Sequence, residues 1–298
     1  MAERRAARPS ATEPRGEHDV EPSEHDVEPS EHDVASMFGV LLTVAYDGTR
    51  FAGYARQPTA RTIAGELDGA IRALDPKASL ARGASRTDSG VHAHGQRVSF
   101  DTRLDIPPRG WALALAQHLS DEVSIVATSR VRAGYDPRDH AMRKTYRYFI
   151  LRSEVRDPFW QHRAWRTSER LNHDAMAAEA HTLVGTHDFR AFRSSTDSRV
   201  DTVRTLVRAE FLSYAVDDRV LVLEITGDRF LHRMMRIIAG TLVDVGRGRL
   251  LPGAVTRGIE SGNRANLGMT APPDGLYLLH IELNDEGSDK WPDHLSSR

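Results

Sequence analysis

Apolar side chains recur along the chain with two periods, one typical of strands and one typical of helices. Val40, Leu42, Val44 and Tyr46 fall on one face of a half-buried strand, because alternate residues of a strand point the same way. Similar patterns predict strands near residues 96–100, 123–132, 138–150, 202–213, 218–226 and 276–281. Apolar residues three or four positions apart predict helices over residues 63–74, 111–119, 171–184 and 231–245.

The order of these elements repeats. A run of strand, helix, strand and strand occurs once before about residue 150 and once after it. Such runs are typical of α+β folds, in which helices flank mostly antiparallel sheets. The sequence therefore predicts two related α+β halves, an N-terminal half over residues 37–150 and a C-terminal half over residues 151–283.

Both ends of the chain differ in composition from the part between them. Residues 1–36 repeat the heptad EHDVEPS, with few large apolar side chains, and are predicted to form a disordered acidic tail. Its histidines, His18, His25 and His32, lie beside carboxylates, which suits either weak binding of divalent metal or plain solvation. Residues 284–298 are predicted to be a polar C-terminal tail.

Composition narrows the class of protein. The chain has no cysteine, which excludes disulfides and thiolate chemistry and fits a reducing cytoplasm. No apolar run approaches the roughly 20 residues of a membrane span, and the N-terminus has no apolar segment typical of a secretory signal. We therefore expect a cytoplasmic protein without a membrane span. Between the two tails the chain carries 34 basic and 28 acidic residues, which suits an acidic partner such as RNA.

The loop at residues 83–100 carries the strongest candidate for chemistry. Asp88 stands two residues after Arg86 and shortly before Gly90, in a loop with three glycines that allow close approach to a ligand. Arg86 offers a planar fork of donors for a carboxylate or a phosphate. An Asp near Gly is also common in turns, where it bonds nearby backbone N–H groups. We interpret Asp88 as a candidate nucleophile and keep turn formation as the alternative.

Two other stretches combine basic residues with aromatic or apolar ones. Residues 138–150 interleave both types on a predicted strand, with Tyr146 and Tyr148 on one face and Arg147 on the other. That face either stacks nucleic-acid bases or belongs to the core. A second basic group, Arg229, His232, Arg233 and Arg236, lies at the start of the last long helix, either as a solvated face or as an anion site.

These segments together resemble the TruA-type tRNA pseudouridine synthases. The similar blocks, in the order of that family, are YDGT at 46–49, RTDSGVHA at 86–93 with GQ at 95–96, KTYRY at 144–148, GTHDF at 185–189 with FR at 192–193, and GDRFLHRMMR at 227–236 with GTLVDVG at 240–246. The resemblance covers about residues 38–283. It implies the pseudouridine synthase fold with two ferredoxin-like halves. It also implies isomerisation of uridine to pseudouridine at positions 38 to 40 of the tRNA anticodon stem-loop, without cofactor or metal, by a homodimer whose tRNA cleft spans both chains.

The resemblance also assigns roles. Asp88 matches the catalytic aspartate, Arg86 the arginine that helps displace the target nucleotide, Tyr146 the tyrosine that stacks on the uracil, and Arg236 the arginine paired with the carboxylate. The carboxylate serves either as a covalent nucleophile or as the base that starts glycal formation, and the sequence leaves both routes open. Further residues expected to contact the substrate are His92, Gln96, Arg138, Lys144, Arg193, Arg229, His232 and Arg233.

The chain departs from the family pattern at several positions. Ser85 and Ser89 stand where the family usually has Gly and Ala, and residues 53–57 and 135–138 also differ. Among competing functions, a non-catalytic RNA-binding or RNA-chaperone protein on the same scaffold would not need Asp88. A glycoside hydrolase would need a second carboxylate near Asp88, and a metal hydrolase would need a ligand motif such as HExxH, which the sequence lacks.

Overall fold

Residues 37–168, 170–287 and 289–291 are described by the computed structural model. The predicted acidic tail at residues 1–36, with its three histidines, lies outside the described residues. Among the described residues, no helix is long and apolar enough to cross a membrane.

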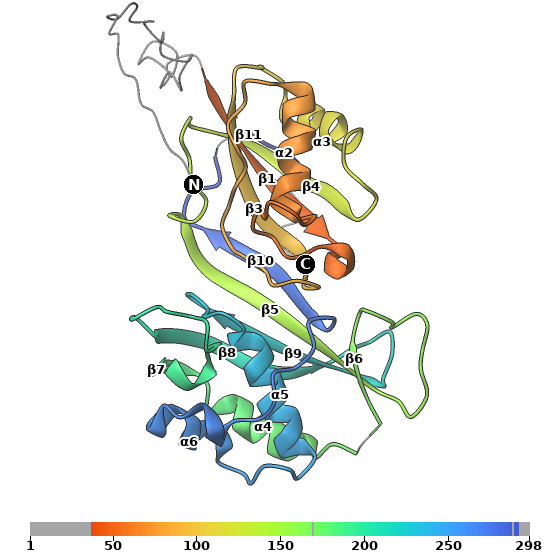
Figure 1. Ribbon diagram of the computed structural model, residues 1–298, viewed down its shortest axis with the longest axis vertical. Coiled ribbons are helices and arrows are strands. Elements are labelled where there is room, and N and C mark those ends of the chain that lie inside the picture. Colours follow the sequence, from red (N-terminus) through yellow and green to blue (C-terminus); the bar gives the residue numbers. More distant parts are fainter. Residues whose placement is uncertain (1–36, 169, 288, 292–298) are drawn as a thin grey trace, which may run out of the picture. The chain divides into compact units, whose positions relative to one another are not determined.

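Strands and helices follow one another through both predicted halves (Figure 1). The strands are β1 (Phe38–Tyr46), β2 (Arg82–Gly83), β3 (His92–Thr102), β4 (Val123–Val131), β5 (Ala141–Arg152), β6 (Trp165–Thr167), β7 (Gly185–Asp188), β8 (Val203–Ser213), β9 (Val220–Gly227), β10 (Leu276–Leu283) and β11 (Asp289–Trp291). The helices are α2 (Ile63–Leu74), α3 (Pro108–Ala116), α4 (His173–His181), α5 (Met234–Gly246) and α6 (Ala254–Ser261), with short 3-10 turns η1 (Gly48–Arg50), η2 (Arg190–Phe192) and η3 (Arg264–Asn266).

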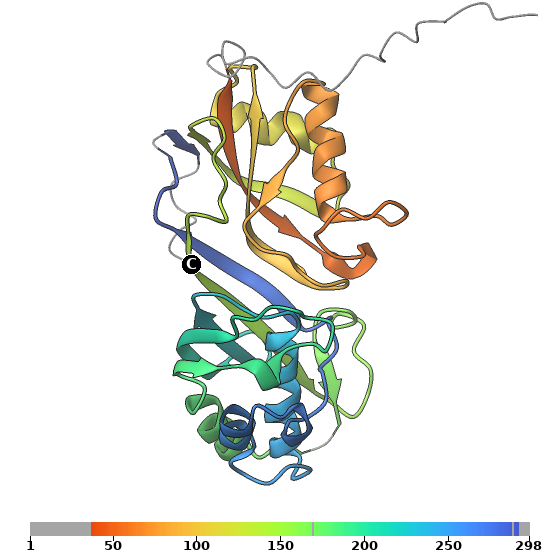
Figure 2. The same cartoon turned by 60° about the vertical axis from the view of Figure 1, so that its left-hand side comes forward.

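Within the described residues all strands belong to one mixed sheet, in the order β11-β4-β1-β3-β10-β5-β9-β8-β7, with β2 beside β3 and β6 beside β5. The pairs are antiparallel except β10 with β3 and β6 with β5. Helix α3 packs against β4 and contacts α2, whereas α4 packs against β8, α5 against β5, and α6 against α4 and α5 (Figures 1 and 2). This confirms the predicted α+β class with a mostly antiparallel sheet.

Strand β10 joins the two predicted halves. It comes late in the chain, yet it pairs with β3 of the N-terminal half and with β5 on its other side. Leu278 is opposite both Ala93 and Tyr146. The two halves therefore share one continuous sheet, and the boundary that we placed at residue 150 falls inside β5.

The chain after β10 returns to the N-terminal half. The Ser129 hydroxyl donates to the Glu286 carbonyl oxygen (2.7 Å), and β11 pairs antiparallel with β4. Residues 289–291 of the segment predicted as a polar tail are thus part of the sheet. Three residues are too few to signal a strand by periodicity, which explains why the sequence did not predict β11.

Local signals set the ends of most helices. Thr62 caps α2, because its hydroxyl oxygen accepts from the Gly65 N–H, and Asn172 caps α4 in the same way. Helix α3 starts earlier than predicted, with Pro108 in its first turn, where proline is tolerated. Helix α5 starts three residues later than its apolar pattern, because Arg233 adopts a left-handed conformation (φ 62°). Helix α6 was not predicted, since it carries only two large apolar side chains, Val255 and Ile259.

Helix α5 approaches the segment before β10 very closely at Gly240. A side chain at this position would overlap the carbonyl oxygen of Met269, which is backbone and cannot rotate away. In the same region the Ala271 N–H donates to the Arg236 carbonyl oxygen (2.9 Å). The missing side chain of Gly240 therefore lets α5 lie against the segment that leads into β10.

We expect Gly240→Ala to lower the free energy of unfolding by about 1–3 kcal/mol, because overpacking forces backbone shifts. The matched control is Gly69→Ala in α2, where nothing lies within 4 Å of the added methyl group. That change should be neutral or stabilising by about 0.5–1 kcal/mol, because Ala favours a helix. Urea unfolding of both variants measures the difference, and equal stability of the two would contradict the close approach.

Candidate active site

The loop that carries Asp88 is held by backbone hydrogen bonds to residues 51–54. The Tyr54 N–H donates to the Thr87 carbonyl oxygen (3.0 Å), and the Gly90 N–H donates to that of Phe51 (3.3 Å). Gly53 has a positive φ of 101°, and a side chain there would come within 2.8 Å of the Thr87 carbonyl oxygen. Residue 53 must therefore be Gly for the Asp88 loop to lie this close to residues 51–54.

Gln96 holds the same loop from strand β3. Its side chain is fully buried, accepts from the Ser85 N–H (3.2 Å) and donates to the Ser85 carbonyl oxygen (2.7 Å). The Tyr46 hydroxyl bonds the Thr87 hydroxyl (2.8 Å), and burial raises the pKa of Tyr46 far above its usual range. These contacts fix the backbone on both sides of Arg86 and leave Asp88 at the end of a supported loop.

The Asp88 carboxylate lies between two basic side chains from the other half of the chain. Arg236 Nη1 is 3.2 Å from Asp88 Oδ2, and His232 Nε2 is 3.4 Å from Asp88 Oδ1. Arg236 Nε donates to the Ala271 carbonyl oxygen (2.8 Å), and the backbone N–H of His232 donates to the Asp197 carboxylate (2.9 Å). The carboxylate itself stays 22 % exposed. The charge of Asp88 is thus balanced while the group remains accessible.

Tyr146 faces this loop from strand β5. Its hydroxyl lies 3.1 Å from the Ser85 hydroxyl oxygen, and its ring contacts Phe230 edge to face. Burial, opposed by the hydrogen bond to Ser85 and assisted by the nearby Asp88 charge, raises the pKa of Tyr146 to about 12. Tyr148 is different, because its ring is fully buried and its hydroxyl donates to the Pro272 carbonyl oxygen (2.7 Å). Of the two tyrosines on this face, Tyr148 belongs to the core and Tyr146 borders the site.

Lys144 lies two residues before Tyr146, on the same face of β5. Its amine donates to the Ala84 carbonyl oxygen (3.0 Å) and to the Ser85 hydroxyl oxygen (3.3 Å). Burial, together with the charges of nearby arginines (Arg138, Arg199 and Arg229), lowers the pKa of Lys144 to about 8.

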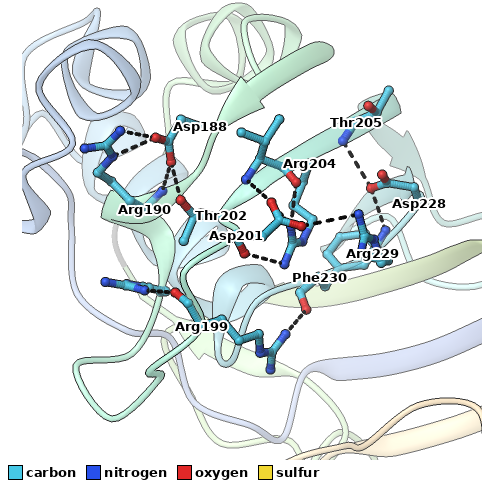
Figure 3. A network of polar contacts seen from close by, with 12 residues as sticks. Asp188, Arg190, Arg199, Asp201, Thr202, Arg204, Thr205, Asp228, Arg229 and Phe230 are labelled. Carbon is cyan, nitrogen blue, oxygen red and sulfur yellow. Dashed lines mark hydrogen bonds and ion pairs between the residues drawn. The ribbon is translucent and has the colours of Figure 1, made fainter.

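The arginines around the site are held by a polar network at the start of strand β8 (Figure 3). Arg199 donates to the Phe230 carbonyl oxygen (3.0 Å), and Arg193 donates to the carbonyl oxygen of Arg199. Arg229 lies 3.5 Å from the Asp201 carboxylate. This network brings two of the predicted substrate contacts, Arg193 and Arg229, into one basic cluster, together with Arg199, which the sequence did not single out.

The other predicted basic residues are exposed. Arg138 is exposed and its guanidinium reaches the Gly83 carbonyl oxygen (3.4 Å). Arg86 and Arg233 are also exposed, and neither forms an ion pair or side-chain hydrogen bond with the described residues. Arg86 is thus available to a ligand beside Asp88, and Arg233 occupies the turn just before α5.

Two predicted substrate contacts, Gln96 and His92, lie inside the protein instead. His92 is 2 % exposed, and burial lowers its pKa, so the neutral ring accepts from the Gly48 N–H (3.2 Å) and donates to the His162 carbonyl oxygen (2.9 Å). Gln96 binds the backbone of Ser85, and His92 binds the backbone of Gly48 and His162. Neither side chain reaches the surface. The alternation of Gln96 with buried Val98 and Phe100 on β3 was a signal of its burial.

Comparisons with known proteins show which chains this one is similar to. The family described as tRNA pseudouridine synthase matches residues 180–284. The tRNA pseudouridine synthase A of Acetivibrio thermocellus is 38 % identical over 245 residues, which cover 82 % of this chain and 99 % of that protein. The tRNA pseudouridine synthase A of Bacillus subtilis is 40 % identical over 241 residues (80 % and 96 %), and that of Geobacillus kaustophilus is 38 % identical over 245 residues (82 % and 93 %).

We expect Lys144 to lose its proton near pH 8, well below the usual pKa of about 10.4 for lysine. The whole chain has only three lysines, Lys77, Lys144 and Lys290, so lysine-labelled protein gives few NMR signals to follow against pH. Lys144→Met assigns the Lys144 signal by its loss. A Lys144 signal that changes only near the usual pKa of lysine, about 10.4, would contradict the effect of burial.

Proposed function

The chain belongs to the tRNA pseudouridine synthase A family, and from this premise we propose that it isomerises uridine to pseudouridine at positions 38 to 40 of the tRNA anticodon stem-loop. The observation that carries the proposal is the Asp88 carboxylate, held between Arg236 and His232 and still accessible. Tyr146 borders the same site.

The reaction needs an ionised carboxylate at the sugar. The bond between C1′ and N1 breaks, the uracil turns, a bond forms between C1′ and C5, and C5 then loses its proton. Asp88 either attacks C1′ directly or takes the C2′ proton to start glycal formation. Both routes begin from the charged carboxylate, and the Arg236 guanidinium lies 3.2 Å from it.

The target uridine must leave its stack before it can reach Asp88, which costs a few kcal/mol. Arg86 is exposed two residues before Asp88 and forms no ion pair or side-chain hydrogen bond with the described residues, so its guanidinium is available to fill the vacated space. Tyr146 offers its ring to the uracil on the other side. These two contacts offset the cost of displacing the nucleotide.

The surrounding cations bind the phosphates of the RNA. Arg138, Arg193, Arg229 and Arg233 lie near the loop or at the start of α5, and Lys144 is directed at the loop itself. Such contacts position the nucleic acid without reading its sequence. The surplus of basic over acidic residues between the tails supports the same role.

We expect Asp88→Asn to reduce turnover to below about one thousandth of the wild-type rate, because the amide can neither attack nor take a proton. The measurement is tritium release from tRNA labelled at C5 of its uridines. Affinity for tRNA should change little, as filter binding would show. The control is Asp121→Asn, the same chemical change at an exposed position on a different loop.

Unchanged tritium release by Asp88→Asn would remove Asp88 from the mechanism. Tight tRNA binding by the wild-type protein without any release would favour the non-catalytic RNA-binding alternative, which needs no carboxylate.

The active unit in this proposal is a cytoplasmic homodimer, since the family forms its tRNA cleft across two chains. Sedimentation equilibrium should then give about twice the 33.2 kDa mass of one chain. The mass of a single chain at micromolar concentration, with full activity, would contradict the dimer.

A further inference from the structure

A row of hydrogen-bonded groups leads from the active site into the protein. The Tyr146 hydroxyl lies 3.1 Å from the Ser85 hydroxyl oxygen, which accepts from the Lys144 amine at 3.3 Å. Ser85 and Tyr146 are 8 % and 6 % exposed, so water has little access to this row. Each of the three groups can both give and receive a proton, if the amine is neutral.

The last step of the proposed reaction needs a base. When C5 is bonded to C1′, its hydrogen must leave as a proton. Asp88 faces the sugar in this proposal and is already bonded to Arg236 and His232. Tyr146 borders the site, but a phenol whose pKa is about 12 keeps its own proton near neutral pH unless another base takes it.

We propose that Ser85 and Lys144 form a proton relay that lets Tyr146 take the proton from C5. The proposal rests on the function proposed above. Tyr146 acts on the reacting base as a catalytic residue, whereas Ser85 and Lys144 act through Tyr146.

The step balances in protons and electrons. The C5–H bond breaks, and its proton goes to the Tyr146 oxygen. The Tyr146 hydroxyl proton moves to the Ser85 oxygen, and the Ser85 proton moves to the neutral Lys144 amine, which becomes ammonium. The electron pair of the C5–H bond forms the C5–C6 double bond, and the pair of the N1–C6 double bond returns to N1, which takes a proton from water.

The charges around Lys144 favour this role. Arg138 lies on the connection from β4 to β5, Arg199 on the segment before β8, and Arg229 just after β9, so three elements direct positive charge at the amine. On its own strand, Tyr146 is uncharged at neutral pH. With a pKa of about 8, Lys144 is partly neutral near neutral pH, and the neutral fraction grows as the pH rises.

Ser85 is the position at which the relay can be cut with least disturbance. The family usually has Gly there, so Ser85→Gly and Ser85→Ala remove the hydroxyl and leave a backbone that related proteins adopt. Ser85→Thr retains a hydroxyl and serves as the matched control. Circular dichroism and tRNA affinity report whether each variant is folded.

The test measures C5–H cleavage with tRNA carrying hydrogen, deuterium or tritium at C5 of its uridines, in single turnovers. We expect Ser85→Gly and Ser85→Ala to slow release by about a hundredfold, as loss of a general base does, with unchanged tRNA affinity. A primary deuterium isotope effect should appear in both variants and in Tyr146→Phe. Ser85→Thr should release near the wild-type rate. The wild-type rate should rise with pH through about 8, and Lys144→Met should lose that rise.

The relay would be overturned if folded Ser85→Gly and Ser85→Ala release tritium at the wild-type rate and show no isotope effect. It would also be overturned if the release rate of Lys144→Met depends on pH as that of the wild-type protein does. If the proposed function itself is wrong, the wild-type protein releases no tritium, and this result is distinct from failure of the relay.

Discussion

The ion pair between Asp88 and Arg236 joins residues that lie 148 positions apart in the chain. Asp88 stands on the loop before β3, and Arg236 in the first turn of α5. Their distance is set by elements that pack rigidly, because β10 is bonded to both β3 and β5, and α5 lies against the segment before β10 at Gly240. A reactive group on a loop is placed accurately only when regular elements support it from several sides.

In the proposed function, the positive charge of the site acts both on RNA binding and on the protonation of Lys144. The arginines that would contact the phosphates of RNA also lower the pKa of the buried Lys144. Phosphates that neutralise these arginines would raise this pKa, so the neutral fraction of the amine at a given pH would fall. RNA binding and the protonation state of Lys144 are therefore linked through charge in this proposal.

Local patterns in the sequence were enough to predict the long strands and most helices, because alternation and helical period report which side chains are buried. The role of the Asp88 loop was expected from its residues and from the family resemblance, and it stays a prediction. Contacts between distant segments left no such pattern. The insertion of β10 between β3 and β5, the strand β11 and the binding of His92 to Gly48 and His162 all depend on pairing across the chain. The hydrogen bonds that link Ser85, Tyr146 and Lys144 likewise follow only from the folded structure, because they join residues about 60 positions apart.

Strand β10 also sets the order in which the protein can form during translation. The centre of the sheet stays open until residues 276–283 have been made, and β4 gains its outer neighbour only with residues 289–291. A chain emerging from the ribosome therefore exposes the unpaired edges of β3 and β5 for most of its synthesis, and such edges invite pairing with other chains. A chain that stops before residue 276 would lack the strand that joins β3 to β5.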